Sequence, residues 1–192
     1  MARDSYHHGD LRAALLRAAA EAIAEDGLDA ASTRSLARRV GVAPSAVFRH
    51  FSDKRALMTA YAAEGLRDLA GEICRRTAHQ NGQALLRARA EAYLDFALSQ
   101  PHRFRAMFRA DLLDRSDREL RAAEAMLEGA LGQGPVEPGA AANDMPRLAQ
   151  AAIHGLATLA LESGLGDALP DDPAERRPAL MAMLRRLAPA LS

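Results

Sequence analysis

Residues 33–51 constrain the fold of this chain more than any other segment, because their spacing fits two short helices joined by a tight turn. Gly41 lies between the two helical stretches, and glycine adopts a positive φ without steric cost. Ala37 is small at the position where the two helix axes would come closest. The pattern predicts a helix-turn-helix, with one helix at residues 33–40 and a second at residues 44–50.

Apolar side chains in this segment are spaced to hold the angle between the two helices. They are Leu36, Val40, Val42 and Val47. Pro44 suits the first turn of the second helix, where its missing N–H removes no hydrogen bond. Any two short packed helices could share this apolar pattern, so an independent indication of function is needed.

The distribution of charge supplies that indication. The chain contains 25 lysines and arginines and 25 acidic residues, so its formal net charge is zero. Between residues 32 and 55, six cations stand against Asp53 alone, for a net charge of +5. The cations are Arg34, Arg38, Arg39, Arg49, Lys54 and Arg55. The rest of the chain carries the compensating acidic residues, so the positive charge is local to the helix-turn-helix, which indicates contact with duplex DNA.

The composition favours helix throughout, because alanine and straight-chain residues dominate while aromatic residues make up only 4% of the chain. Apolar spacing predicts an all-α fold of about nine helices. Besides the two above, the expected helices span residues 10–25, 53–77, 83–100, 104–113, 116–131, 145–165 and 173–187. We expect a DNA-binding domain at residues 1–52 and a larger helical domain at residues 53–192, connected by the helix at 53–77.

Short polar residues and glycines mark the expected ends of these elements. Asp10, Thr33 and Ser52 are the expected N-caps of the first, second and fourth helices, and Gly27 is the expected left-handed residue after the first. Residues 132–143 are rich in glycine and proline and are expected to form a flexible loop.

Several classes of protein are not expected from this sequence. Cys74 is the only cysteine, which excludes an internal disulfide and a cysteine-based metal site. The chain begins with polar residues and has no apolar run near the ~20 residues of a membrane span, so we expect a cytoplasmic protein. It has no phosphate-binding glycine loop, nucleophile elbow or cluster of metal ligands, so we expect no enzymatic activity, metal or cofactor.

Five short stretches carry a family resemblance. They are Tyr6-His-His-Gly-Asp-Leu-Arg, Glu25-Asp-Gly-Leu, Thr33-Arg-Ser-Leu-Ala, Val47-Phe-Arg-His-Phe-Ser-Asp-Lys-Arg-Ala-Leu and Ile153-His-Gly-Leu-Ala-Thr-Leu. The first four closely resemble the tetracycline-repressor (TetR) family over residues 6–60. The last is a weaker match to the WHG-type C-terminal domain of one branch of that family.

The resemblance implies that residues 44–50 form a recognition helix in the major groove. The candidate DNA-binding residues are then Thr33, Arg34, Pro44, Ser45, Ala46, Arg49, His50 and Lys54. Arg49 could grip guanine in a bidentate manner or contact a phosphate, and the sequence leaves both open. Lys54, the only lysine of the chain, suits a phosphate contact. Phe48 stands where the family usually has tyrosine, and we expect it to pack rather than bind.

The resemblance also implies that residues 53–192 form a ligand-binding and dimerisation domain, and that a small-molecule effector bound there weakens DNA affinity. An apolar ligand would suit the candidate pocket residues Tyr93, Phe96, Phe104, Met107, Phe108, Leu112, Met126 and His154, although these side chains could equally fill an ordinary core. The candidate dimer interface consists of Leu148, Ala152, Leu156, Leu159, Leu180, Met183, Leu184 and Leu187.

A homodimer would place its two recognition helices on a pseudo-palindromic operator. A repressor released by a small apolar effector is the favoured interpretation. The alternatives are a transcriptional activator and a non-specific DNA-binding protein without an effector.

Overall fold

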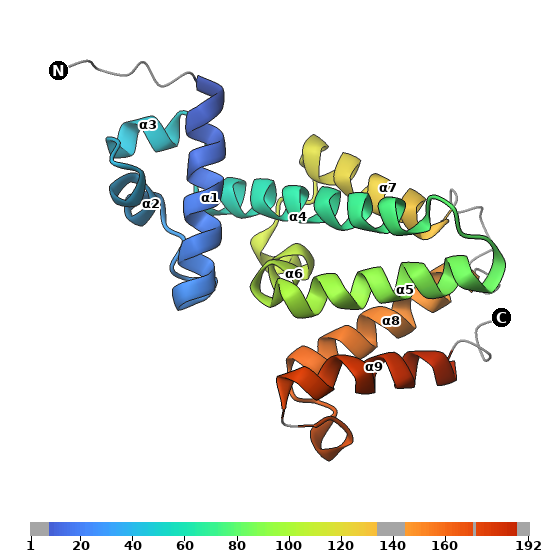
Figure 1. The fold of residues 1–192 in the computed structure, drawn as a ribbon. Coiled ribbons are helices and arrows are strands. Elements are labelled where there is room, and N and C mark those ends of the chain that lie inside the picture. The colour runs from blue at the N-terminus through green and yellow to red at the C-terminus, as the bar shows by residue number, and fades with distance from the viewer. Residues whose placement is uncertain (1–7, 134–144, 171, 188–192) are drawn as a thin grey trace. The chain divides into compact units, whose positions relative to one another are not determined.

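The computed structural model describes residues 8–133, 145–170 and 172–187 (Figure 1). The described residues contain nine α-helices and no strand, which confirms the all-α prediction. The helices are α1 (His8–Asp26), α2 (Thr33–Val40), α3 (Pro44–Phe48), α4 (Lys54–Thr77), α5 (Gly82–Ser99), α6 (Pro101–Phe108), α7 (Arg118–Leu131), α8 (Met145–Leu161) and α9 (Pro173–Leu187), with 3₁₀ turns at Ala110–Leu112 and Gly166–Ala168. The loop expected at residues 132–143 lies, beyond Gln133, outside the described residues.

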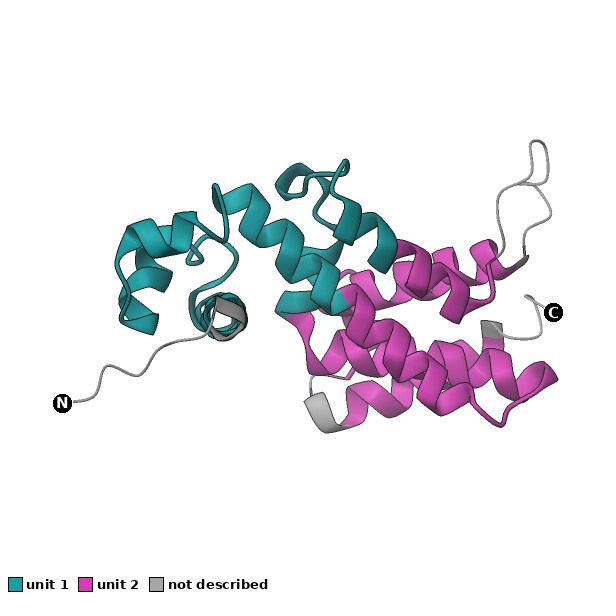
Figure 2. Ribbon diagram, turned by 90° about the horizontal axis from the view of Figure 1, so that it is seen from above, with its two compact units in different colours: residues 1–65, 102–123 teal, residues 66–101, 124–192 magenta. Residues whose placement is uncertain are grey.

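The chain divides into two compact units (Figure 2). The first unit comprises residues 1–65 and 102–123, and the second comprises residues 66–101 and 124–192. Helix α4 therefore contributes residues to both units. The boundary predicted after residue 52 separates two functions, DNA binding and ligand binding, and does not coincide with the boundary between the compact units. It stays a prediction.

Each unit has an apolar core of its own, and burial of this kind is the main favourable term in its stability. In the first unit, α1, α2, α3 and the start of α4 contribute the fully buried side chains Leu15, Ile23, Leu36, Val47 and Leu57. Phe51 is also buried there. The fully buried side chains of the second unit include Leu69, Ile73, Tyr93, Leu94 and Leu180.

The predicted N-cap of α2 is wrong by one residue. Ser32, not Thr33, is the N-cap, and its side-chain oxygen accepts a hydrogen bond from the Ser35 N–H at 3.1 Å. The Ser35 hydroxyl oxygen in turn accepts from the Ser32 N–H at 3.1 Å. This reciprocal capping box satisfies two amide groups at once, which explains why the helix is capped one residue earlier than expected.

Two other predicted caps are also corrected. Helix α1 begins at His8, so Asp10 lies inside the helix. Asp53, not Ser52, caps α4, because its Oδ1 accepts a hydrogen bond from the Ala56 N–H at 2.8 Å. A carboxylate at this position satisfies an amide that has no partner within the helix and also interacts favourably with the helix dipole.

Helix α6 begins three residues earlier and ends five residues earlier than predicted. It starts at Pro101, the residue directly after the helix predicted at residues 83–100. Proline suits the first turn of a helix, because its missing N–H would have no partner there. After Phe108 the chain continues as the 3₁₀ turn at Ala110–Leu112.

The ends of α1 and α8 both involve a residue with positive φ. Gly27 follows α1 with φ +85°, and its N–H donates to the Ile23 carbonyl at 2.9 Å, as predicted. Helix α8 ends at Leu161, four residues before its predicted end. Beyond it, Ser163 takes a φ of +56°, and the Gly164 N–H donates back to the Leu159 carbonyl at 2.8 Å. This bond closes the helix, although the apolar spacing of the sequence continues.

Thr59 is a buried polar residue that joins α4 to the segment preceding α7 within the first unit. It is 2% exposed. The hydroxyl donates to the Arg55 carbonyl at 2.8 Å and accepts from the Asp114 N–H at 2.9 Å. The hydroxyl therefore satisfies a partly buried backbone donor from a segment 55 residues away in the sequence.

Thr59→Val is expected to lower the free energy of unfolding by about 1–3 kcal/mol, because it leaves the Asp114 N–H without its acceptor. Urea unfolding followed by circular dichroism measures the change. Thr59→Ser is the matched control, since it keeps the hydroxyl, and it should retain most of the stability. A loss from Thr59→Ser as large as that from Thr59→Val would attribute the effect to the methyl group instead.

Candidate nucleic-acid interface and effector cavity

The turn between α2 and α3 has the geometry that the sequence predicts. Gly41 takes φ +75° at the C-terminus of α2, and the Val42 N–H donates to the Ala37 carbonyl at 2.9 Å. Leu36, Ala37 and Val47 are all at most 2% exposed. The small Ala37 side chain and the left-handed Gly41 thus fix the angle at which α3 leaves α2.

One face of α3 presents a mixed polar and apolar surface to solvent. Ser45, Phe48 and Arg49 are exposed, and their spacing of three and four residues places them on the same side of the helix. Ala46 and His50 are half-buried. The helix starts at proline, as predicted, and ends two residues before its expected end.

The expectation that Phe48 packs is wrong, because 51% of the residue is exposed. Val47 occupies the core position, and the next residue lies about 100° further round the helix. Sequence reasoning therefore missed Phe48 as a member of the exposed face. Its three-residue spacing from Ser45 is the signal that could have found it.

Five of the six cations of the +5 segment fall into two groups, and the sixth, Arg55, donates to the Asp111 carbonyl at 3.1 Å. Three arginines are exposed and form no ion pair with a described residue, namely Arg34, Arg38 and Arg49. In contrast, Arg39 pairs with Glu25 at 2.5 Å, and Lys54 donates to Asp29 Oδ1 at 2.9 Å. The candidate phosphate contact Lys54 is therefore paired with an acidic side chain.

Both acidic partners are held in the ionised form. The hydrogen bond from Arg39 lowers the pKa of Glu25, and the hydrogen bond from Lys54 lowers the pKa of Asp29. Asp29 is fully exposed in the loop between α1 and α2, so its pair with Lys54 is screened by solvent. A phosphate could replace this carboxylate at the lysine at little cost.

The eight candidate pocket residues are divided between the two units. Phe104, Met107, Phe108 and Leu112 belong to the first unit, whereas Tyr93, Phe96, Met126 and His154 belong to the second. Phe104 and Phe108 pack against each other with ring centroids 5.0 Å apart. Met126 is 53% exposed.

Tyr93 and His154 form a hydrogen-bonded pair between α5 and α8. The Tyr93 hydroxyl lies 2.9 Å from His154 Nδ1. Burial raises the pKa of Tyr93 and lowers the pKa of His154, so both groups are held neutral near pH 7. This contact fits the alternative interpretation of the pair as satisfied core residues.

A cavity of about 420 Å³ lies elsewhere in the second unit, among α5, α8 and α9. None of the eight candidate pocket residues lines it. Its wall is formed by Gln83, Ala84, Leu86, Arg87, Arg89, Ala90, Leu131, Pro146, Ala149, Gln150, Ile153, Leu184 and Arg185. These residues come from segments as far apart in the sequence as α5 and α9, so no local pattern could have predicted the cavity.

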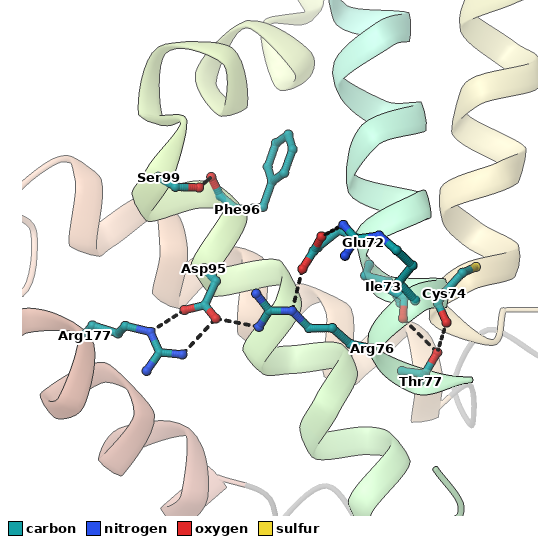
Figure 3. Close-up of polar contacts among 10 residues, drawn as sticks. Glu72, Ile73, Cys74, Arg76, Thr77, Asp95, Phe96, Ser99 and Arg177 are labelled. Atoms are coloured by element: carbon teal, nitrogen blue, oxygen red, sulfur yellow. Dashed lines mark hydrogen bonds and ion pairs between the residues drawn. The ribbon is translucent and has the colours of Figure 1, made fainter. Parts of the chain in front are cut away.

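The second unit also contains a carboxylate that joins three helices (Figure 3). Asp95 on α5 accepts from Arg177 Nε on α9 at 2.6 Å and from Arg76 Nη1 on α4 at 2.6 Å. Only 15% of the Asp95 side chain is exposed. Burial alone would raise the pKa of Asp95, but the hydrogen bonds from Arg177 and Arg76 outweigh it and lower that pKa.

Asp95→Asn is expected to lower the free energy of unfolding by on the order of 1 kcal/mol at pH 7, because it leaves two arginines without their shared anion. The pKa of Asp95 is lowered on folding, so its contribution is present above the pKa of the unfolded chain and is lost as the pH falls through the folded value.

Urea unfolding between pH 7 and pH 3 measures this dependence. The parent protein should lose more stability on acidification than Asp95→Asn does. Asp167→Asn is the matched control, since Asp167 is exposed and has no ion pair to a described residue. If the free energy of unfolding fell equally with pH in the parent and in Asp95→Asn, the ionisation of Asp95 would not contribute to the pH dependence of stability.

The candidate dimer residues lie on α8 and α9, and they differ in exposure. Leu148 and Leu159 are 47% and 44% exposed. They are eleven residues apart, about three turns, so they share one face of α8. Ala152 and Met183 are half-buried, and Leu187 is the last residue of α9. The remaining three, Leu156, Leu180 and Leu184, are buried within the chain.

Two features are absent from the described residues. They contain no group of three or more His, Cys, Asp or Glu side chains arranged to hold a metal ion. Across the same ranges of the chain, no helix combines the length and the apolar character that crossing a bilayer requires.

The fold, with a glycine turn between α2 and α3 and exposed arginines on α2 and at the end of α3, defines a helix-turn-helix protein of the DNA-binding type. A family model described as bacterial regulatory proteins of the tetR family matches residues 15–61. A second model, the tetracyclin repressor-like C-terminal domain, matches residues 86–185, more than half of the chain. The chain belongs to the TetR family of transcriptional regulators, and these matches are to regulators rather than to enzymes.

Individual proteins are also similar to this chain in sequence or in fold. An uncharacterised HTH-type transcriptional regulator of Bacillus subtilis, YobS, is 26% identical over 92 residues, which are 48% of each sequence. The chain thus spans about half the length of this curated relative. A protein of unknown function from Rhodococcus sp. RHA1 is 29% identical, with a TM-score of 0.72 over 98% of each chain.

A third relative shares the fold at lower identity. It is a TetR variant from Acinetobacter baumannii AYE, solved in complex with minocycline. It is 22% identical, with a TM-score of 0.58 over 98% of this chain and 99% of the other.

Proposed function

We propose that this protein is a cytoplasmic, homodimeric repressor that binds a pseudo-palindromic operator and is released by a small, largely apolar effector. The observation that carries the proposal is the exposed face of α3, where Arg49 has no ion pair to a described residue and stands in a segment of net charge +5. Such a face can enter the major groove of DNA and contact both bases and backbone.

The proposed base readers lie on the recognition helix, which Pro44 starts. Ser45, Ala46 and Arg49 face base edges, where the guanidinium offers two donors to guanine. Phe48 joins them, because its exposed ring suits a thymine methyl group.

The proposed phosphate contacts flank the recognition helix on both sides. Thr33 and Arg34 stand at the start of α2, where backbone N–H groups and the helix dipole favour an anion. His50 follows α3, and Lys54 is the first residue of α4. These contacts would fix the register of the protein on the duplex without reading its sequence.

The proposed dimer forms through α8 and α9 of each protomer. Leu148 and Leu159 provide exposed apolar side chains at the two ends of one face of α8. The half-buried Ala152 and Gly155 lie between them in the sequence, and their small size allows a second helix to approach closely. Two such pairs of helices would form a four-helix interface about a two-fold axis.

The effector part of the proposal is supported by the cavity among α5, α8 and α9, whose volume suits a small molecule. The fold is also that of a TetR variant solved with minocycline. Helix α4 has residues in both units, so it offers a continuous element through which a ligand could act on the DNA-binding segment. A coupling of ~1–3 kcal/mol is enough for a measurable switch.

In-vitro selection of bound duplexes tests the DNA-binding part, and a two-fold symmetric consensus is the expected result. A binding curve with no sequence preference would instead support the alternative of a non-specific DNA-binding protein. A reporter gene placed behind the selected operator separates repression from activation, since deletion of the regulator should raise expression if it is a repressor.

Asp29→Asn is expected to raise affinity for the operator a few-fold, because it frees the Lys54 ammonium from its acidic partner and removes a negative charge near the DNA. Fluorescence anisotropy at low salt measures the change. Glu128→Gln, which makes the same change of charge at an exposed position in the second unit, should leave the affinity unchanged. Equal gains from both variants would point to net charge rather than to Lys54.

A further inference from the structure

The cavity among α5, α8 and α9 has a predominantly apolar wall. Its aliphatic lining comes from four helices and includes Leu86, Ala90, Leu131, Ile153 and Leu184. Its volume of about 420 Å³ falls in the range of roughly 300–1,000 Å³ that is usual for small-molecule sites. An apolar ligand body would therefore be well accommodated.

The charged residues of the same wall are all cationic. Arg87, Arg89 and Arg185 line the cavity, and no described aspartate or glutamate does. Arg87 pairs with Glu91 at 3.4 Å, so its charge is balanced. Arg89 and Arg185 form no ion pair with a described residue, which leaves two positive charges at one cavity.

Arg89 has an additional unsatisfied group. Its Nε is buried and has no hydrogen-bond partner in the described part of the chain. Its guanidinium packs against Gly132, where an added Cβ would lie only 2.5 Å from Nη1. A buried donor of a charged group without an acceptor is costly, so an acceptor that enters the cavity would relieve this cost.

We propose that this cavity binds an amphipathic anion, in which a carboxylate is carried on an apolar chain or ring. Arg89 and Arg185 receive the carboxylate, and Leu86, Ile153 and Leu184 contact the apolar part. The planar guanidinium suits a carboxylate because it offers two parallel N–H donors. This inference rests on the proposed function, since it names the chemical class of the effector.

Isothermal titration of the full chain with three ten-carbon probes tests the charge preference. The probes are decanoate, 1-decanol and decylamine, which share an apolar chain and differ in head-group charge. Decanoate should bind most tightly and decylamine most weakly. Equal affinity for decanoate and 1-decanol, or no binding of decanoate at concentrations on the order of 1 mM, would overturn the proposal.

Variants of the two cavity arginines test where the carboxylate of decanoate binds. Arg89→Gln and Arg185→Gln should each weaken decanoate binding about tenfold and leave 1-decanol binding unchanged, because each removes a charge-assisted hydrogen bond. Arg186→Gln is the matched control, since Arg186 is exposed on the same helix as Arg185 and does not line the cavity. Ile153→Phe fills the apolar part of the cavity and should weaken the binding of both decanoate and 1-decanol. Undiminished decanoate binding by both arginine variants would refute the assignment.

Operator binding in the presence of decanoate separates this inference from the proposed function. Arg89-dependent binding of decanoate with unchanged operator affinity would support the anion site and refute release by this class of effector. Loss of operator binding with decanoate that persists in Arg89→Gln would support release and refute the site. Thermal unfolding of each variant verifies that the fold is retained.

Discussion

Leu36→Ala is expected to lower the free energy of unfolding by about 2–5 kcal/mol and to abolish operator binding. Leu36 is fully buried on α2, which packs against both α1 and α3, and its side chain helps to fix the angle of the helix-turn-helix. Alanine would lose the transfer free energy of the removed atoms and leave a cavity that the two short helices can close only by moving.

Urea unfolding gives the stability change, and fluorescence anisotropy gives the loss of DNA binding. Leu86→Ala is the matched control for leucine truncation, because Leu86 is 42% exposed and its loss should change stability by no more than about 0.5 kcal/mol. Similar losses from both variants would show that the core position of Leu36 does not explain the effect.

Arg49→Ala is expected to weaken binding to the selected operator by about 10–100-fold and to relax the base preference at one position of each half-site. A bidentate arginine contact to guanine contributes about 1–3 kcal/mol of discrimination, and Arg49 is exposed on the face of α3 that carries Ser45 and Phe48. The measurement compares the affinities of the parent and the variant for a panel of single-base operator variants.

Lys54→Ala is the comparison variant for this experiment. It should weaken binding to all DNA sequences by roughly the same factor. It should also reduce the slope of the logarithm of the binding constant against the logarithm of the salt concentration by about one unit, as the loss of one phosphate contact would. A uniform loss from Arg49→Ala as well would reassign Arg49 to a phosphate contact.

The helix-turn-helix could be predicted from the sequence because its determinants are local. The positive φ of Gly41, the small Ala37 and the buried Leu36 and Val47 all act within about ten residues of one another. Such short-range constraints are present in the sequence itself and depend little on the rest of the chain.

The N-caps show where local patterns are insufficient. Ser32 and Thr33 are both good capping residues, as are Ser52 and Asp53. The choice between neighbours depends on whether a side chain reaches a particular amide, and that depends on the path of the incoming chain. The hydrogen bonds of Ser32 and Asp53 decide both cases.

Phe48 shows a different limit of local patterns. Phenylalanine in place of the usual tyrosine suggests an apolar, packed environment, yet the residue is exposed. Burial depends on the direction in which a side chain leaves the helix, and Val47 already occupies the inward direction.

The sequence alone determined the all-helical architecture, the helix-turn-helix and the local positive charge, because helix propensity, turn chemistry and charge are properties of nearby residues. The tertiary structure decided which side chains form the cavity. Arg89 on α5, Ile153 on α8 and Leu184 on α9 meet only when the chain folds, while the aromatic residues that cluster in the sequence are divided between two units. Contacts between distant segments depend on how the helices pack, and no short-range pattern encodes that packing.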